Sequence, residues 1–161
     1  MQIRKASGNE MLALWEYPDV SVASPTAQFF YNNIVTGNAV FWTVENEGEL
    51  IGELYVFQDL EDRDFADGNK TVYLCAFRIR EDYRGKGIGT MLLNKVLSEL
   101  KTAGFTRATI GVSPKEERNI KLYRSQGFVK KVKECYIDPC AMDKNMRPKS
   151  DRSFWLLASD L

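Results

Sequence analysis

The sequence predicts an α/β fold, a sheet covered by helices, in which at least one pair of strands runs parallel. Two observations lead to this prediction. A strand-like run at 71–79 is followed by a glycine-rich turn and a long amphipathic helix pattern, and a second strand and a second helix come directly after them. A helix that crosses between two neighbouring strands requires those strands to be parallel. The length of 161 residues suits one domain, residues 1–161, with a sizeable core.

Each element is expected from its local pattern. The expected strands are residues 2–6, 39–45, 49–57, 71–79, 106–112, 129–137 and 153–159, and the expected helices are 8–17, 25–36, 88–103 and 114–126. Ser24 and Pro25 are typical of a helix start, and Gly37 of a helix end. The two strands 39–45 and 49–57 are joined by Asn46-Glu47-Gly48, which indicates a hairpin.

The second half of the chain carries the strongest signals. The run "TVYLCAFRI" at 71–79 has few charges, which predicts a central strand buried on both faces. Ile88, Leu92, Val96 and Leu100 recur every four residues and predict the apolar face of the next helix, with Gly104 at its end. The string "SPKE" at 113–116 predicts a capping box that starts the last helix at residue 114. The segment "DPCAMDKNMRPKS" at 138–150 is expected to be an irregular linker.

Composition excludes several classes of function. The chain has no histidine and only three cysteines, so it can form neither a Ser-His-Asp triad nor a Cys-His pair, and we expect no metal site. A formal net charge of zero argues against a nucleic-acid-binding protein. No apolar run approaches the ~20 residues of a membrane span, and the N-terminal residues lack the apolar core of a signal peptide. With too few cysteines for a disulfide framework, we expect a cytoplasmic protein.

Charge is unevenly distributed along the chain. Residues 45–67 hold nine acidic residues and one basic residue, a net charge of −8, and residues 118–152 hold ten basic and four acidic residues, a net charge of +6. Most such side chains are expected to form an ordinary solvated surface. A second interpretation is that the acidic stretch, with Glu53 and the loop 58–69, favours a cationic ligand on one face of the molecule.

The string "YRGKGIGTMLL" at 83–93 places three glycines directly before the strongest helix. The first turn of a helix has backbone N–H groups without intrahelical partners and carries a partial positive charge. Glycines there let an anion approach the backbone, so the arrangement predicts a phosphate-binding loop, with Arg84 and Lys86 adding positive charge. The segment lacks G-x-x-x-x-G-K-[ST] and G-x-G-x-x-G, which argues against a P-loop and against a dinucleotide fingerprint.

What remains is R-x-x-G-x-G, formed by Arg84, Gly87 and Gly89, and this segment resembles the acyl-CoA pyrophosphate loop of the GNAT superfamily of N-acetyltransferases. The resemblance continues to "RNIKLYRSQGF" at 118–128, so that it covers about residues 72–128. It implies a mixed, largely antiparallel central sheet of about six or seven strands flanked by helices, with a splayed central parallel strand pair. It also implies acetyl-CoA as cosubstrate, with no metal.

The resemblance assigns roles to individual residues. The amides of residues 85–90 would hold the pyrophosphate of coenzyme A, the end of the strand 71–79 would pair with the pantetheine arm, and the N–H near Phe77 would point at the thioester oxygen. The residues expected to contact the cofactor are Phe77, Ile79, Arg84, Gly85, Lys86, Gly87, Ile88, Gly89, Thr90 and Asn119. Tyr123 is the candidate that protonates the leaving thiolate, although an aromatic residue on such a helix is often simply part of the core.

Two positions depart from the family pattern. Glu116 stands where the family usually has Asn, so Asn119 is only a candidate contact to the pantetheine arm. Gly111 stands where some members carry a glutamate as general base, which leaves the base unassigned. Glu53 and Tyr73 are candidates to hold a water molecule that takes the proton.

The resulting expectation is an N-acetyltransferase that acts on a primary amine of a small molecule or peptide by direct attack on the thioester. No nucleic-acid or membrane partner is expected, and a homodimer is left open. Two alternatives stay open: a CoA-binding sensor or scaffold with little turnover, which the glycine at position 111 favours, and an interaction module in which the glycines only form a turn. The acceptor matches no motif.

Overall fold

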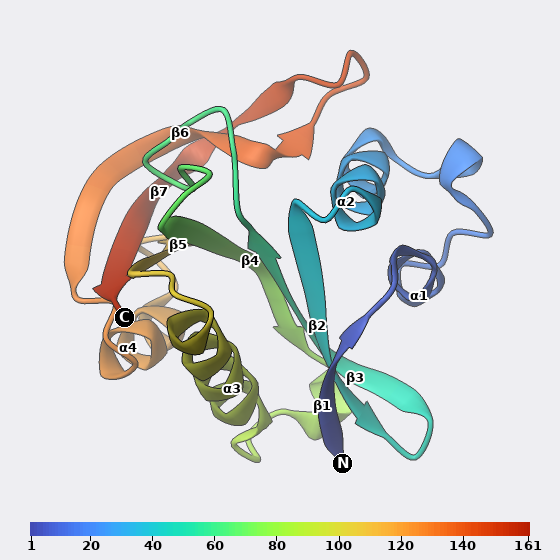
Figure 1. The fold of residues 1–161 in the computed structure, drawn as a ribbon, viewed down its shortest axis with the longest axis horizontal. Coiled ribbons are helices and arrows are strands. Elements are labelled where there is room, and N and C mark those ends of the chain that lie inside the picture. Colours follow the sequence, from blue (N-terminus) through green and yellow to red (C-terminus); the bar gives the residue numbers. More distant parts are fainter.

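Seven strands form one mixed sheet in the computed structural model, which describes residues Met1–Leu161 (Figure 1). The strands are β1 (Gln2–Ala6), β2 (Ala39–Asn46), β3 (Glu49–Phe57), β4 (Thr71–Ile79), β5 (Arg107–Val112), β6 (Lys130–Met142) and β7 (Pro148–Asp160). Their order in the sheet is β1-β2-β3-β4-β5-β7-β6. Only β4 and β5 are parallel, and all other neighbouring pairs are antiparallel. The predicted fold class is therefore confirmed.

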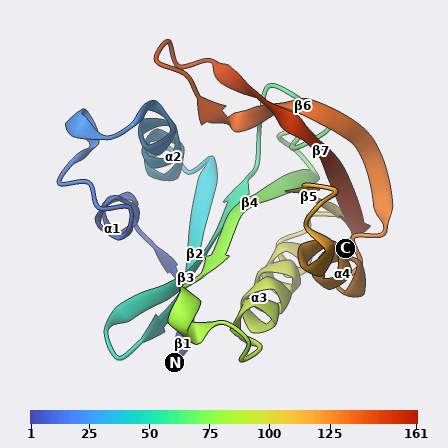
Figure 2. The same cartoon turned by 180° about the vertical axis from the view of Figure 1, so that it is seen from behind.

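Helices cover both faces of the sheet (Figure 2). They are α1 (Gly8–Leu14) and α2 (Pro25–Val35) on one face, and α3 (Ile88–Thr102) and α4 (Glu117–Ser125) on the other, with short 3-10 turns at Val20–Val22 and Glu81–Tyr83. Each face has its own apolar core. Leu92, Leu93 and Val96 of α3 are fully buried in one core, and Met11 of α1 and Phe30 of α2 are buried in the other. No helix is long and apolar enough to cross a membrane.

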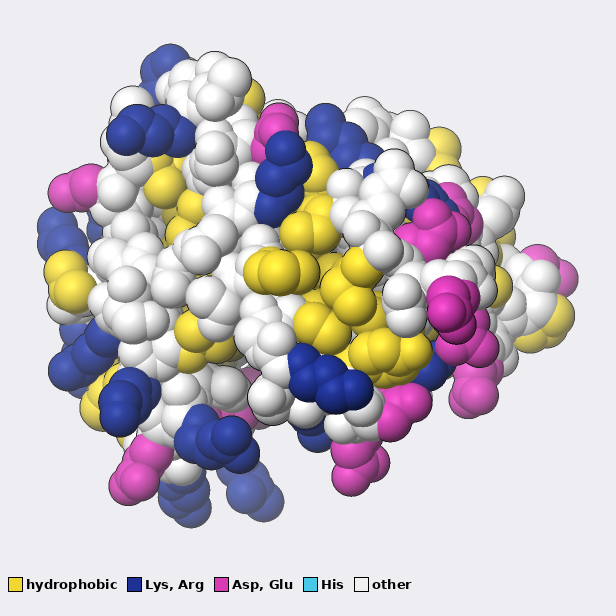
Figure 3. Space-filling model, turned by 90° about the horizontal axis from the view of Figure 1, so that it is seen from below, with side chains coloured by type: hydrophobic (Ala, Val, Ile, Leu, Met, Phe, Trp, Pro, Cys, Tyr) yellow, Lys and Arg dark blue, Asp and Glu magenta, His cyan; other side chains and the backbone are white.

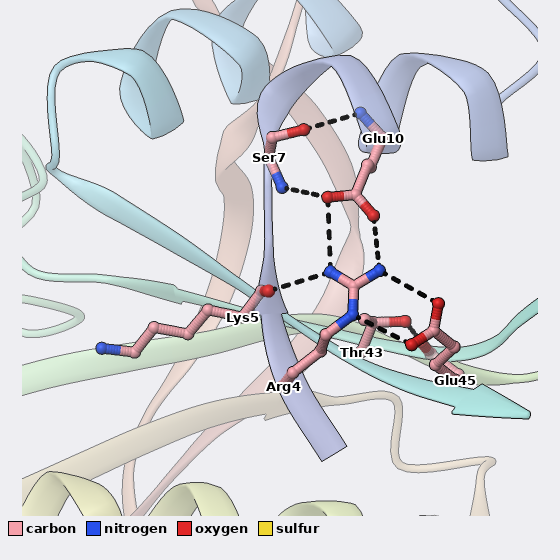
Figure 4. A network of polar contacts seen from close by, with 7 residues as sticks. Arg4, Lys5, Ser7, Glu10, Thr43 and Glu45 are labelled. Carbon is pink, nitrogen blue, oxygen red and sulfur yellow. Dashed lines mark hydrogen bonds and ion pairs between the residues drawn. The ribbon is translucent and has the colours of Figure 1, made fainter. Parts of the chain in front are cut away.

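The N-terminal helix is held by a network of polar contacts (Figure 4). Ser7 and Glu10 form a capping box, in which the Ser7 hydroxyl accepts from the Glu10 amide and the Glu10 carboxylate accepts from the Ser7 amide. Arg4 of β1 pairs with the same Glu10 at 2.7 Å and with Glu45 of β2 at 3.3 Å. The hydrogen bond from Arg4 holds the pKa of Glu10 below its ordinary value. One guanidinium thus fixes α1 relative to two strands.

The segment 138–150 is not the irregular linker that the sequence suggested, and that expectation was wrong. β6 runs on to Met142 and β7 starts at Pro148, so most of the segment forms an antiparallel hairpin. Asp143 closes the turn by accepting from the amides of Asn145 and Arg147. Irregular register between Asp138 and Met142 interrupts the alternation of side chains, which hid the strand from pattern analysis.

Two further expectations need adjustment. Ser113 and Glu116 do make the predicted contact, since the Glu116 carboxylate accepts from the Ser113 amide at 3.0 Å, but they form a turn, and α4 begins at Glu117. In β4, only Val72, Tyr73 and Leu74 are buried, so the strand is covered on both faces in its first half alone. The second half of β4 is partly open because it has no neighbour on one side.

Candidate functional site

β4 and β5 lie side by side over only part of their length. Four residue pairs join them, from Thr71 with Arg107 to Leu74 with Ile110. Beyond Leu74, β4 continues to Ile79 while β5 pairs only with β7. The two strands splay apart into a fork, as the family resemblance implied. An open strand edge of this kind can pair with an extended ligand.

The backbone of β4 is distorted where the two strands separate. Ala76 has a φ of +50°, in the left-handed region that non-glycine residues rarely adopt. Glu53 of β3 faces Arg78 and Tyr55 faces Cys75, so one residue of β3 lies opposite two residues of β4. This is a β-bulge, which turns the peptide groups of β4 at the point where the strand loses its partner. Backbone of this kind is concentrated at functional sites.

The glycine-rich loop presents a row of free backbone donors. None of the six amides of residues 85–90 donates a hydrogen bond within the protein. Gly85 and Gly87 have φ values of +75° and +79°, and a Cβ at either position would meet no atom within 4 Å. Gly87 is the N-cap residue of α3, so the positive end of the helix dipole adds to the amides. The loop is therefore built to bind an anion such as a pyrophosphate.

The loop, the end of β4 and the start of α4 enclose a cavity of about 630 Å³, the loop cavity. The residues predicted to contact acetyl-CoA that line it are Phe77, Ile79, Arg84, Gly85, Gly87, Ile88, Gly89, Thr90 and Asn119. Lys86 is the exception, because its ammonium group lies 5.2 Å from the centre of the Tyr83 ring. Arg84 donates from Nε to the carbonyl oxygen of Ile79 at 2.8 Å, which ties the loop to the end of β4.

Several residues that line the loop cavity were not predicted from the sequence. Leu122 and Arg118 of α4 line it beside Asn119, and Arg78 lines it from β4. Leu122 could have been inferred, because it lies three residues after Asn119 and therefore on the same face of the helix. Arg78 had no comparable signal.

Tyr123 does not line the loop cavity. Its side chain is 6% exposed, and its ring lies 6.4 Å from Phe77 and 6.3 Å from Phe128. The hydroxyl makes no hydrogen bond within the protein, and since no fully buried side-chain oxygen is unpaired, the hydroxyl oxygen retains some contact with solvent. Burial raises the pKa of Tyr123, which keeps the proton on its oxygen. Tyr123 is therefore one ring away from the cavity, behind Phe77.

Glu53 forms a second cluster on the α1 side of the sheet. Its Oε1 accepts from Trp15 Nε1 at 2.8 Å, from the Tyr55 hydroxyl at 3.0 Å and from Arg78 Nη2 at 3.4 Å. The guanidinium of Arg78 lies 5.5 Å from the centre of the Trp15 ring. Trp15, Glu53 and Arg78 line a cavity of about 520 Å³, the Glu53 cavity, which is also lined by Arg84. Three donors on one oxygen make this carboxylate an anchor for Trp15 and Arg78.

Gly111 lies where the sequence analysis noted a missing glutamate. A Cβ there would approach the Tyr73 hydroxyl to 3.1 Å and the ring of Phe154 to 3.2 Å. Tyr73 and Phe154 therefore fill the space that a side chain at this position would need. Burial raises the pKa of Tyr73, so that its hydroxyl stays protonated at neutral pH.

A third cavity, the Asp138 cavity of about 290 Å³, lies between β4, α2 and β6. Arg78 lines all three cavities, so they meet at this side chain. No residue of the acidic loop 58–69 lines any of them. The loop instead packs toward β6, where Lys133 pairs with Asp62 at 2.7 Å and with Asp64 at 3.0 Å. The acidic loop therefore lies away from the fork.

Charge is nevertheless unevenly distributed on the face of the molecule that Figure 3 shows. Figure 3 shows acidic side chains toward the end of the molecule that carries α1 and the β2–β3 hairpin, basic side chains toward the end that carries α4, and apolar side chains between them. Several acidic side chains are paired within the protein, as Glu49 is with Arg80 and Glu45 with Arg4. Their net field on a ligand is accordingly weaker than a count of carboxylates suggests.

Comparisons with known proteins agree with this geometry. The curated N-acetyltransferase YdgE of Bacillus subtilis, itself uncharacterised, is 25% identical over 104 residues; the match spans 61% of this chain and 63% of that protein. The ribosomal-protein-S18-alanine N-acetyltransferase of Escherichia coli superposes with a TM-score of 0.72 at 15% identity, over 99% of this chain and 92% of that one. A GNAT family acetyltransferase of Elizabethkingia anophelis with acetyl-CoA bound superposes with a TM-score of 0.65 at 16% identity, over 99% and 97%.

The model of the acetyltransferase (GNAT) family matches residues 9–128. This range contains both sequence motifs, the fork of β4 and β5 and the loop cavity. The chain therefore belongs to the GNAT acetyltransferase family.

Proposed function

We propose that this protein transfers the acetyl group of acetyl-CoA to a primary amine by direct attack of the amine on the thioester. The observation that carries the proposal is the row of six unpaired amides at residues 85–90, placed beside an open strand edge. A pyrophosphate on the loop and an extended, amide-containing arm along β4 satisfy both features at once. The similar fold that was solved with acetyl-CoA bound supports the choice of ligand.

Different residues of the chain have different roles in the proposed reaction. The amides of 85–90 and Arg84 hold the phosphates, and the edge of β4 near Phe77 directs a backbone N–H toward the thioester oxygen, where negative charge develops. Amine attack then breaks the carbon–sulfur bond. The leaving thiolate has a conjugate pKa of roughly 8.5, below that of tyrosine, so a tyrosine hydroxyl can supply its proton only if it is held within hydrogen-bond reach and regains a proton afterwards. We assign this proton to Tyr123, whose hydroxyl is protonated and free of other hydrogen bonds.

The acceptor binds on the opposite side of the fork, along the Glu53 and Asp138 cavities. These lie between β4 and the first two helices, and they are lined by aromatic residues such as Trp15 and Phe30 with Arg78 at their junction. The aromatic faces can contact an ammonium group, which suits an amine on a small molecule or at a peptide N-terminus. The acidic loop 58–69 takes no part in the proposed acceptor site, because it packs elsewhere.

A screen of amines tests the proposal. Spermidine, kanamycin, free amino acids and a peptide with an N-terminal alanine are incubated with acetyl-CoA, and release of the free thiol is followed. Titration calorimetry with coenzyme A is run in parallel. We expect binding and at least one turned-over amine. Binding without any turnover would favour the alternative of a CoA-binding sensor. The absence of a carboxylate at position 111 is consistent with that alternative. Absence of binding would leave only an interaction module.

A further inference from the structure

We propose that Asp138 is the carboxylate that takes the proton from the acceptor amine. The inference rests on the proposed function and supplies the general base that Gly111 lacks. An amine with a pKa near 10 is only about 0.1% neutral at pH 7, so a base in contact with it accelerates the reaction. The base must lie on the acceptor side of the fork, near the point where β4 leaves β5.

Asp138 lies at that point. The Asp138 cavity is bounded by Cys75 and Ala76 of β4, by Phe30 of α2, and by Asp138 and Cys140 of β6. Ala76 is the bulged residue at which β4 has lost its partner β5. The carboxylate of Asp138 therefore shares a cavity with the segment of β4 along which the thioester is expected to lie. An amine that enters between α2 and β6 meets both groups.

The chain holds this carboxylate in place and leaves part of it free. One oxygen of Asp138 accepts from the Cys140 amide at 2.9 Å. Thr26 of α2 accepts from the Met142 amide at 3.0 Å, which fixes this part of β6 against the helix. The backbone amides of Cys140 and Ala141 are the groups of the protein that stabilise the charge of Asp138, no side chain donates to it, and the residue lines the cavity. The carboxylate is available to an ammonium group.

Of the other carboxylates around the fork, Glu53 and Glu116 accept hydrogen bonds within the protein, and Glu16 lines the Glu53 cavity but not the Asp138 cavity. Glu53 accepts three hydrogen bonds on one oxygen and faces the cation of Arg78. Glu116 accepts from the Ser113 amide on the loop side. Burial raises the pKa of Asp138 above its ordinary value of 3.8; the charge of Asp151 adds to the increase, and the backbone amides of the hairpin oppose it. A carboxylate with a raised pKa is a stronger base, provided that it is still ionised at neutral pH.

Several titratable or charged groups surround Asp138 from the packed elements. They are Tyr73, Cys75 and Arg78 of β4, Cys140 of β6, and Lys149 and Asp151 of β7. Burial raises the pKa of Cys140 and of Tyr73, so both stay protonated at neutral pH. The elements α1 and α2 contribute Trp15, Thr26 and Phe30, which do not titrate. Asp138 is thus the carboxylate that faces the cavity.

The proposed step balances in protons and electrons. The ammonium of the acceptor gives one proton to Asp138, and the neutral nitrogen attacks the carbonyl carbon of the thioester. The carbon–sulfur bond breaks with its electron pair on sulfur, and the thiolate takes one proton from Tyr123. The nitrogen then loses a second proton, which returns to Tyr123 by way of water. Asp138 passes the proton that it took to water in the cavity. The sum is one ammonium and one acetyl-CoA converted to one acetamide, one free thiol and one proton.

The test compares Asp138→Asn with Asp151→Asn, using spermidine, kanamycin, lysine and an alanyl peptide as acceptors. In Asp138→Asn the side-chain amide keeps an oxygen for the Cys140 amide but cannot take a proton, and Asp151 is exposed on the same hairpin. We expect kcat/KM for the best amine to fall by about 10²- to 10⁴-fold at pH 7 in Asp138→Asn. The defect should shrink toward pH 10, where the amine loses its proton unaided. Asp151→Asn removes a charge that adds to the raised pKa of Asp138 but leaves the proton acceptor itself in place, so kcat/KM should stay within about threefold of wild type.

Thermal unfolding gives a second readout. A carboxylate whose pKa is raised by folding is destabilising when ionised, so its stabilising contribution is present at low pH and is lost as the pH rises through the folded pKa. Asp138→Asn should therefore have a higher Tm than wild type at pH 7, and the difference should disappear below the ordinary pKa of 3.8. A residue kept only for structure would lose stability instead.

Each outcome decides the question. Wild-type kcat/KM and an unchanged pH profile in Asp138→Asn, with the acetyl-CoA Kd intact, would overturn the assignment. If that variant does not fold, Asp138→Ser removes the carboxylate and keeps an oxygen that can accept from the Cys140 amide, and an unchanged pH profile with undiminished turnover would overturn it equally. If the wild-type protein binds coenzyme A but acetylates none of the amines, the proposed function itself fails. A failure of the Asp138 assignment alone is distinguishable, because the wild-type protein then still acetylates an amine.

Discussion

Replacing Gly87 by valine tests the loop that carries the proposed function. Gly87 has a φ of +79°, where an L-residue is strained by roughly 1–2 kcal/mol, and more so when it is β-branched. The strain is relieved if the peptide on either side rotates. Rotation of a single peptide removes at least one of the six free amides from the phosphate. A hydrogen bond to a charged group is worth about 1.5–3 kcal/mol, so the Kd for coenzyme A should rise about ten- to a hundredfold.

Titration calorimetry with coenzyme A measures this effect, and Gly37→Val is its matched control. Gly37 has a φ of +83° after α2, and a Cβ there also meets no atom within 4 Å. Both variants should lose a similar amount of stability in thermal unfolding, whereas only Gly87→Val should lose affinity. Unchanged affinity in a folded Gly87→Val protein would refute the site, as would an equal loss in both variants.

Three further predictions concern the surroundings of the fork. Tyr123→Phe keeps the ring packing and removes the proton donor, so kcat should fall about ten- to a hundredfold with little change in the KM for acetyl-CoA; a wild-type kcat would return Tyr123 to the core. Glu53→Ala leaves the donors of Trp15 and Tyr55 without an acceptor, so the free energy of unfolding measured with denaturant should fall by about 1–3 kcal/mol. The KM for the acceptor should rise. Unchanged stability would argue against Glu53 as an anchor for these side chains. Neutralising the loop residues Asp59, Glu61, Asp62 and Asp64 together should leave both KM values within about twofold and cost about 1 kcal/mol of stability, since exposed pairs are weak. A higher acceptor KM would place the loop at the site after all.

The elements of the proposed cofactor site were predictable because their signals are local. Gly85 and Gly87 sit within a few residues of the helix that they precede, and helix periodicity marked Leu92 and Val96 as core. Backbone conformation at these positions depends on little beyond the neighbouring residues. The fork itself followed from the family resemblance and is confirmed by the pairing of β4 with β5.

The side of the fork on which we place the acceptor could not be predicted in the same way. Arg78 reaches all three cavities only because the β3–β4 register places it opposite Glu53, and no local pattern encodes that register. Asp138 enters its cavity through a hairpin whose register slips, and Pro139 and the slip conceal the strand in the sequence. Contacts between β6 and α2, more than a hundred residues apart, arise only in the folded chain.

The positions of the acidic residues show the same limit. A net charge of −8 over residues 45–67 suggested an attractive surface for a cation. In the fold, an arginine forms an ion pair with each of Glu45, Glu49 and Glu53. Lys133, on a distant strand, forms ion pairs with Asp62 and Asp64. Charge counted along the sequence omits these partners, which is why the loop looked like part of an acceptor site.

An acetyl mass balance tests directly whether the protein transfers the acetyl group of acetyl-CoA to an amine. The wild-type protein is incubated with acetyl-CoA labelled in the acetyl group and with the best amine of the screen, and both the free thiol and the labelled amide are quantified by mass spectrometry over time. We expect one acetylated amine for each thiol released, with a rate that depends on amine concentration. Thiol released without acetylated amine, or no turnover of any amine by protein that binds coenzyme A, would contradict it.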